Sequence, residues 1–255
     1  MSSSLYYLKL CKDLQNINLP NNIKVLPNKC FYNYFNLKSI TLPTSIKLIE
    51  NKCFDNCYKL TCINNQSLTC LTKLGKKCFH NTRLKDIEFL KNTHIMYLPE
   101  ECFNGCEFER VTLPTTIKHI ASCCFMNCCK LQNIIIPNSV TYIGDSCFYG
   151  CDKLTRIDLS TNLTCLPEEC FSCCTNLKHI VLPDKITKIH EDTFIDCRLK
   201  YIQWSRNLKT IILWNDKEKH IKETDDLLHI YRKYCETFCY YDFDKRITFI
   251  KKIFK

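Results

Sequence analysis

The sequence predicts a mainly β solenoid, in which about eight or nine coils of ~23 residues stack along one axis. One repeated motif carries this prediction. The dipeptide Cys-Phe begins at Cys30, Cys53, Cys78, Cys102, Cys124, Cys147 and Cys170, and Thr193-Phe194 is an eighth copy. Subtracting successive Phe numbers gives spacings of 23, 25, 24, 22, 23, 23 and 23. Such a fixed period is typical of stacked repeats, because each unit buries its apolar side only against its neighbours.

The first element of each unit is a short strand. The second copy begins Leu37-x-x-Ile40-x-Leu42 and continues with Pro43. Apolar residues two positions apart favour a strand with one buried face. Proline has no N–H to donate to the next strand, so we expect the strand to end there and a turn to begin.

The second element is another short extended segment, followed by a single turn. In the same copy it runs from Ile46 to Ile49, and Phe54 follows after Cys53. We expect each Phe to fill the wide back of its coil, where the chain turns to start the next one. Parallel neighbours joined in this way form a right-handed, curved solenoid.

The third and fourth copies depart from the pattern. Two extra residues stand where the proline and its turn should be. We expect these insertions to bulge as loops near Asn64–Cys70 and Leu90–His94, because insertions in solenoids map to loops on one face.

The ends of the chain are predicted to close the stack. Residues 1–212 form the solenoid, and Tyr7, Leu8 and Leu14 resemble the end of a truncated first coil. Residues 213–255 form a cap with a helix that starts at Thr224 as N-cap. For the tail from residue 246 to 255, which alternates basic and apolar residues, we favour a closing strand over a membrane-surface or partner-docking segment.

The repeated unit resembles the BspA-like, or treponemal-type, leucine-rich repeat family. The sixth copy carries the family signature most fully, with Ile143-Gly144 followed by Cys147-Phe148-x-x-Cys151. The resemblance covers about residues 5–212. Cys stands in seven copies where the family has Ala before Phe, and most copies lack the Gly. The resemblance implies a curved leucine-rich repeat solenoid with a binding role, often at cell surfaces, and no catalytic residues or cofactor.

Composition limits the partners and the location. The formal net charge is +10, which gives a weak attraction to anionic surfaces. There is no 18-residue apolar run and hence no transmembrane helix, and the start of the chain lacks the pattern of a secretory signal. We therefore predict a cytoplasmic protein, with export to the cell surface by a non-classical route as the alternative.

The chain contains 22 cysteines, and their periodicity suggests how they are used. Cysteines at fixed core positions behave as small buried apolar residues, so we favour reduced thiols. Disulfides between neighbouring coils are the second interpretation, because coils about 4.8 Å apart lie within bridging distance. Zinc is the third, because Cys-x-x-x-Cys is not the usual spacing and no histidine recurs with it. In adjacent pairs such as Cys123-Cys124, we expect one member to be exposed.

The candidate binding residues flank the buried residue of each first strand. They should point outward from the concave sheet. The residues at these outward positions differ from coil to coil, whereas the buried residues between them recur. The position before the buried residue holds Asn16, Ser39, Cys62, Asp86, Arg110, Asn133, Arg156, His179 and Tyr201, and the position after it holds Asn18, Thr41, Asn64, Glu88, Thr112, Ile135, Asp158, Val181 and Gln203. In the C-terminal half we select Arg110, Asn133, Ile135, Arg156, Asp158, His179, Val181, Tyr201 and Gln203 as the binding set. Arg and Tyr dominate many interfaces, although a solvated face without a partner accounts for these columns equally well.

A second column is basic. It contains Lys24, Lys47, Lys73, Lys118, His119, Lys188 and Lys209. Aromatic residues do not alternate with it regularly, so we favour a solvated face over nucleic-acid binding.

Three function classes follow from these features. We favour a non-catalytic scaffold for protein–protein interaction that binds a protein through its concave strand face. The alternative is a cell-surface adhesion or antigen-like protein. An enzyme is the least favoured class, because the chain has no phosphate-binding loop or nucleophile motif, and His179 with Asp158 is the only notable pair.

Overall fold

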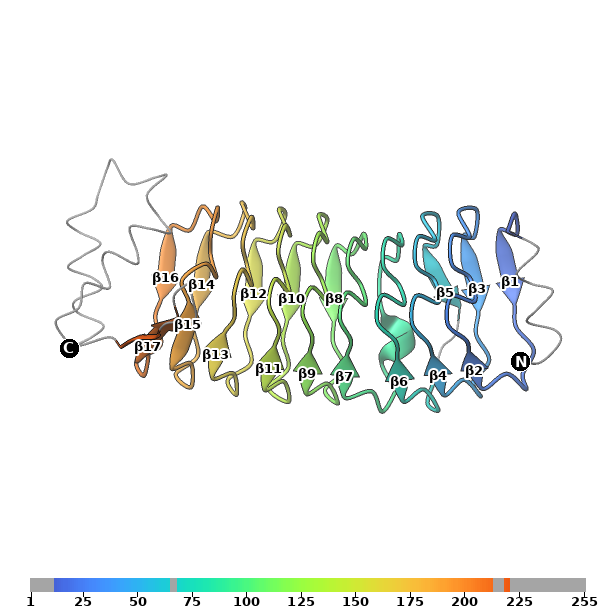
Figure 1. Ribbon diagram of the computed structural model, residues 1–255, viewed down its shortest axis with the longest axis horizontal. Helices are drawn as coiled ribbons and strands as arrows, with labels where there is room; N and C mark the ends of the chain where they lie inside the picture. The colour runs from blue at the N-terminus through green and yellow to red at the C-terminus, as the bar shows by residue number, and fades with distance from the viewer. Residues whose placement is uncertain (1–11, 65–67, 213–217, 221–255) are drawn as a thin grey trace.

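A computed structural model describes residues 12–64, 68–212 and 218–220. Figure 1 shows one elongated stack of coils, with the described N-terminal and C-terminal coils at opposite ends. The structure is a β-solenoid of about eight turns of ~23 residues with almost no helix. The predicted fold class is therefore confirmed. The boundary at residue 212 stays a prediction, and the helix expected from Thr224 lies outside the described residues.

In every described coil except the fourth, the first strand is three residues long and its middle residue is buried. These strands are β1 (Asn16–Asn18), β3 (Ser39–Thr41), β5 (Cys62–Asn64), β8 (Arg110–Thr112), β10 (Asn133–Ile135), β12 (Arg156–Asp158), β14 (His179–Val181) and β16 (Tyr201–Gln203). Neighbours pair in parallel, so that Ile134 lies between Val111 and Ile157. The outward positions therefore align from coil to coil as the repeat predicts.

The second strands form a separate face of the solenoid. They are β2 (Val25–Leu26), β4 (Leu48–Ile49), β6 (Lys73–Leu74), β7 (Tyr97–Leu98), β9 (His119–Ile120), β11 (Tyr142–Ile143), β13 (Cys165–Leu166), β15 (Lys188–His190) and β17 (Thr210–Ile212). They pair in parallel within three sheets, β2–β4–β6, β7–β9–β11 and β13–β15–β17, and at the end of the last sheet β18 (Glu218–His220) runs antiparallel to β17. β18 therefore extends the last of these sheets into the region expected to form the cap.

A ladder of phenylalanine rings fills the back of the coils. It consists of Phe31, Phe54, Phe79, Phe103, Phe125, Phe148, Phe171 and Phe194, all with no exposed surface. Consecutive ring centroids lie 5.2–5.7 Å apart and the rings are close to parallel. Offset stacking at this separation is favourable and adds to the burial of each ring. The predicted role of the repeated Phe is thus confirmed.

Two positions in most coils adopt the left-handed backbone conformation that brings the chain around the Phe. One of them holds Asn or Gly in six coils, at Asn33, Asn56, Asn81, Gly105, Asn127 and Gly150, and Cys173 and Asp196 in the last two. Asn and Gly are the residue types that tolerate positive φ most readily. The asparagine side chains also bond to each other, with Asn56 donating to Asn33 and Asn81 donating to Asn56. The turn is therefore supported by both backbone preference and bonds between coils.

The nineteen cysteines in the described part of the chain are free, and thirteen of them are buried. The cysteine three residues after Phe donates its thiol to the Phe carbonyl of the preceding coil, as Cys151 does to Phe125 at 3.2 Å. The same bond recurs from Cys57, Cys106, Cys128, Cys174 and Cys197. These cysteines thus serve as weak hydrogen-bond donors as well as small core residues, a role that the repeat pattern alone did not indicate. In the adjacent pairs Cys124, Cys128 and Cys174 are buried, while Cys129 is exposed and Cys123 and Cys173 are half-buried.

The fourth coil corrects two expectations. The positions of Asp86 and Glu88 do not belong to a strand, because a 3-10 helix, η1 (Glu88–Leu90), replaces it. The insertion does not simply bulge outward either, since Phe89 turns inward and packs 5.4 Å from the Phe79 ring. Burial of an extra aromatic ring offsets the lost strand pairing here.

Candidate binding site

The candidate site lies on the outward side of the first strands, which we call the first-strand face. Its N-terminal part is neutral and polar, and Ser39 donates a hydrogen bond to Asn16. Asp86 and Glu88, at the strandless fourth coil, interrupt the face. The C-terminal part combines cationic and apolar side chains, and both hollows described below lie there. The proposed binding residues are therefore confined to one half of the solenoid.

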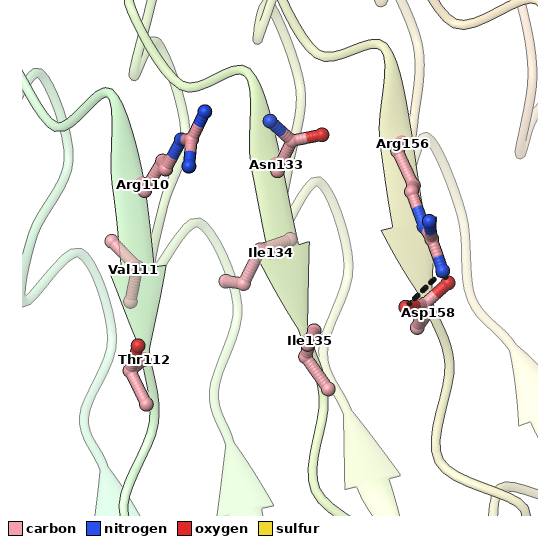
Figure 2. A pocket seen from close by; sticks show the side chains of 8 residues that line it. All are labelled: Arg110, Val111, Thr112, Asn133, Ile134, Ile135, Arg156 and Asp158. Atoms are coloured by element: carbon pink, nitrogen blue, oxygen red, sulfur yellow. Dashed lines mark hydrogen bonds and ion pairs between the residues drawn. The ribbon is translucent and has the colours of Figure 1, made fainter.

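The first hollow covers β8, β10 and β12 and has a volume of about 370 Å³. Figure 2 shows Arg110 and Asn133 side by side at one level of neighbouring strands. Val111 and Ile134 form its floor, and Ile135 projects outward with 63% of its surface exposed. Among the described residues Arg110 makes no ion pair. The hollow thus offers a free guanidinium, a side-chain amide and an exposed apolar side chain together.

Arg156 and Asp158 form an ion pair along the edge of the same hollow. The guanidinium of Arg156 donates two hydrogen bonds to the Asp158 carboxylate, at 3.1 and 3.0 Å (Figure 2). This contact raises the pKa of Arg156. Since both side chains are largely exposed, the pair is worth little for stability and can open toward a ligand at low cost.

A second hollow of about 560 Å³ lies where the first-strand sheet is interrupted. β12 ends one three-stranded sheet and β14 begins a two-stranded one, so no strand pairing links them. Arg156 and Asp158 line this hollow from one side, and His179 and Val181 line it from the other. Val181 is 53% exposed. Thr161 and Pro183 also contribute, and sequence reasoning did not select them.

The last coil extends the surface beyond the second hollow. β16 pairs with β14 so that Tyr201 lies beside His179 and Gln203 lies beside Val181. The His179 and Tyr201 ring centroids are 6.4 Å apart. All nine selected residues therefore lie on consecutive strands of one face. Asp158 bonds to Arg156 while His179 packs on Tyr201, so the His179–Asp158 pair noted in the sequence does not form in the structure.

The seven basic residues were expected to align in one column, and the structure shows that this prediction was wrong. Strand pairing aligns Lys73 with Leu48 and Lys188 with Cys165, whereas Lys24 and Lys47 precede those strand positions by one residue. The seven basic residues therefore divide between two neighbouring columns. Tyr97, His119 and Tyr142 align with each other on the same face, and the two tyrosines are about half exposed. The sequence analysis did not select these tyrosines.

The remaining chemistry of the described residues is limited. No group of three or more His, Cys, Asp or Glu among them is placed to hold a metal ion. Burial raises the pKa of the Cys57 and Cys106 thiols to about 12. In this part of the chain no helix has the length and apolar character needed to cross a bilayer.

Comparison with known proteins addresses the fold. A family model described as BspA type leucine rich repeat region matches residues 4–98 and 96–214, in six copies. A leucine-rich repeat protein from Bacteroides ovatus is similar over 80% of this chain, with 24% identity and a TM-score of 0.63. That match spans 56% of the Bacteroides chain, so the present chain covers little more than half its length.

A second solved structure is comparable. The leucine-rich repeat protein of T. pallidum matches 72% of this chain and 76% of its own, with 24% identity and a TM-score of 0.50. No curated protein matches the sequence. At 24% identity these two structures show a shared fold, and they do not identify site residues in the present chain.

Proposed function

The chain belongs to the BspA-type leucine-rich repeat family, and on that premise we propose that it is a non-catalytic scaffold that binds a partner protein through the first-strand face. The family match confirms the resemblance seen in the repeated unit. One observation carries the proposal: Arg110, Asn133, Ile135 and Arg156 converge on one hollow, while the residues beneath them repeat the core pattern.

The chemistry of this half of the face supports a protein partner. Ile135 and Val181 are large apolar side chains exposed among polar neighbours. Arg110 and Arg156 can bind carboxylates or backbone carbonyls, and Tyr201 supplies a rigid aromatic surface. Such combinations of Arg, Tyr and exposed aliphatic residues are typical of the residues that dominate interface energy.

The same face can be used to test the proposal. A triple variant, R156A/H179A/Y201A, removes three consecutive outward side chains of β12, β14 and β16. None of them belongs to the core, so we expect the fold to persist, as circular dichroism would show. Affinity capture followed by mass spectrometry should then lose the partners that the unchanged chain retains.

A matched control comes from the neutral half of the same face. The variant N16A/S39A/T41A removes the same number of outward side chains from β1 and β3. We expect it to retain all partners. Survival of every partner in the triple variant, or equal loss in the control, would show that the C-terminal half of this face is not the binding surface.

The location of this binding is a separate proposal. We place it in the cytoplasm because the free, mostly buried cysteines suit a reducing compartment. Display at the cell surface is the alternative. Protease treatment of intact cells distinguishes the two, since a surface protein is removed and a cytoplasmic one is protected.

A further inference from the structure

Positive charge is concentrated at one end of the solenoid. Residues 12–85, which span the three coils from β1 to β6 (Figure 1), contain 12 Lys and Arg but only 3 Asp and Glu. Residues 86–212 contain 13 Lys and Arg against 15 Asp and Glu. The first three coils therefore carry a formal charge of +9, close to the +10 of the whole chain. Such asymmetry between two parts of a chain favours an anionic partner for the basic part.

The few carboxylates of these coils are mostly engaged by their own chain. Asp55 is buried and hydrogen-bonded to His80 at 2.7 Å. The Glu50 carboxylate accepts the backbone N–H of Asn28 at 2.8 Å. Neither carboxylate is therefore left to neutralise the lysines around it.

Most of the twelve cations have no acidic partner. Three of them pair with glutamates of the fourth coil, namely Lys76, Lys77 and Arg83. The other nine make no ion pair in the described part of the chain. Lys52 is half-buried, and the remaining eight are exposed, at Lys12, Lys24, Lys29, Lys38, Lys47, Lys59, Lys73 and Lys85.

Two exposed aromatic rings lie among these lysines, on the turn that follows the Cys-Phe pair. Phe35 and Tyr58 stack with their ring centroids 5.6 Å apart and their planes 7° apart, and they are 48% and 47% exposed. In the next six coils the same position holds Arg83, Glu107, Cys129, Asp152, Thr175 and Arg198. The aromatic pair is thus confined to the first two coils of the described stack.

Lysines accompany the aromatic pair on the same turns. The Lys59 Nζ donates a hydrogen bond at 2.9 Å to the side-chain oxygen of Asn36, the residue after Phe35. The Lys29 Nζ lies 5.6 Å from the centroid of the Tyr32 ring. These contacts are with neutral groups, so the lysines keep their full charge. We call this surface the basic-aromatic edge, and it consists of Lys29, Phe35, Lys38, Lys52, Tyr58 and Lys59.

The arrangement of the two rings distinguishes between anionic partners. Bases of single-stranded nucleic acid bind by stacking on open aromatic faces. Phe35 and Tyr58 each cover one face of the other, so no base can lie between them. At a bilayer surface, in contrast, aromatic side chains sit at the level of the headgroups, and nearby lysines attract anionic lipids. The edge therefore fits a bilayer surface better than a nucleic acid.

We propose that the basic-aromatic edge binds the surface of a bilayer that contains anionic lipids. Phe35 and Tyr58 enter the headgroup region, and the four lysines contact the anionic headgroups. Each lysine close to such a surface raises the affinity about fivefold. The edge is built from turns around the phenylalanine ladder, so it leaves the first-strand face free and does not depend on what that face binds.

Sedimentation with sucrose-loaded vesicles tests this proposal on the full chain. Vesicles of phosphatidylcholine mixed with phosphatidylserine should bind the protein, and vesicles of phosphatidylcholine alone should bind it at least about tenfold more weakly. Binding to the mixed vesicles should be lost in about 1 M salt, where the Debye length falls to about 3 Å.

Two double variants separate the rings from the charges. F35A/Y58A removes both rings and keeps the charge, whereas K29A/K59A removes two charges and keeps the rings. Each should lower the affinity for the mixed vesicles by about tenfold or more. All four side chains are exposed, so the fold should persist, which circular dichroism checks.

Matched controls come from other parts of the stack. Lys153 occupies in the sixth coil the position of Lys59 in the second, and Lys185 donates to Asn162 as Lys59 donates to Asn36. K153A/K185A therefore changes the net charge equally, away from the edge. Y97A/Y142A removes two half-exposed rings from the second-strand face. Both controls should change the affinity by less than about twofold, because distant exposed charges are screened.

The absence of binding to the mixed vesicles in low salt would overturn the proposal. So would equal binding to phosphatidylcholine alone, or controls that bind as weakly as K29A/K59A. A labelled single-stranded oligothymidine provides the last comparison. If it binds the chain, loses affinity in F35A/Y58A and displaces the protein from the vesicles, the edge is a nucleic-acid site and the proposal is wrong.

Discussion

Truncation of one ring in the middle of the phenylalanine ladder tests the physical basis of the stack. The Phe125 ring has no exposed surface and lies between Phe103 and Phe148, at centroid distances of 5.7 and 5.6 Å. Phe125→Ala would remove roughly 150 Å² of buried apolar surface. At about 25 cal/mol per Å² this amounts to about 4 kcal/mol.

The cavity left by Phe125→Ala adds to this cost. Rings on both sides are held by their own neighbours, so the site cannot collapse freely, and we expect a loss of about 4–5 kcal/mol, at the upper end for such truncations. Urea unfolding followed by circular dichroism measures it. A decrease in the m-value would indicate that the coils on either side of Phe125 have begun to unfold separately.

Phe35→Ala serves as the control for this measurement. Phe35 also stacks on an aromatic ring, that of Tyr58 at 5.6 Å, but it is 48% exposed. Its truncation should cost less than about 1 kcal/mol, because little surface is removed from water. The reasoning is refuted if Phe125→Ala costs less than about 1 kcal/mol, or if the two variants cost the same.

The remaining predictions concern the thiols. Cys151→Ala removes a buried side chain and its hydrogen bond to the Phe125 carbonyl. It should lower the free energy of unfolding by about 1–2 kcal/mol, as measured with urea. Cys129 is exposed, so Cys129→Ala should lower it by less than about 0.5 kcal/mol. Alkylation at pH 8 with mass spectrometry should label Cys62, Cys70 and Cys129 in the folded protein and the thirteen buried thiols only after denaturation; rapid labelling of Cys57 would contradict this. Burial raises the pKa of Cys57 and Cys106 from 9.0 to about 12, so the unfolded chain loses these protons first. Their contribution to stability should be complete below pH 9 and decline as the pH rises toward 12, which a series of urea midpoints would show.

The order and register of the strands followed from the sequence because one local pattern recurs. Each first strand alternates a buried residue with outward ones, and proline or serine follows most of these strands, so the position of Ile40 predicts that of Ile134 four repeats later on the same face. The nine selected residues on the first-strand face share one surface for this reason. Where the repeat was irregular the prediction failed, because Phe89 could bury its ring only by replacing a strand with η1.

The sequence by itself determined the solenoid, its period and the ring at the back of every coil, because burial in a stacked repeat depends on the same local residues each time. Only the tertiary structure decided which coils pair and which do not. The gap between β12 and β14, the thiol bonds to carbonyls one coil away and the division of the basic column all depend on atoms about 20 residues apart. Such contacts are set by how neighbouring coils align in space, which no single repeat specifies.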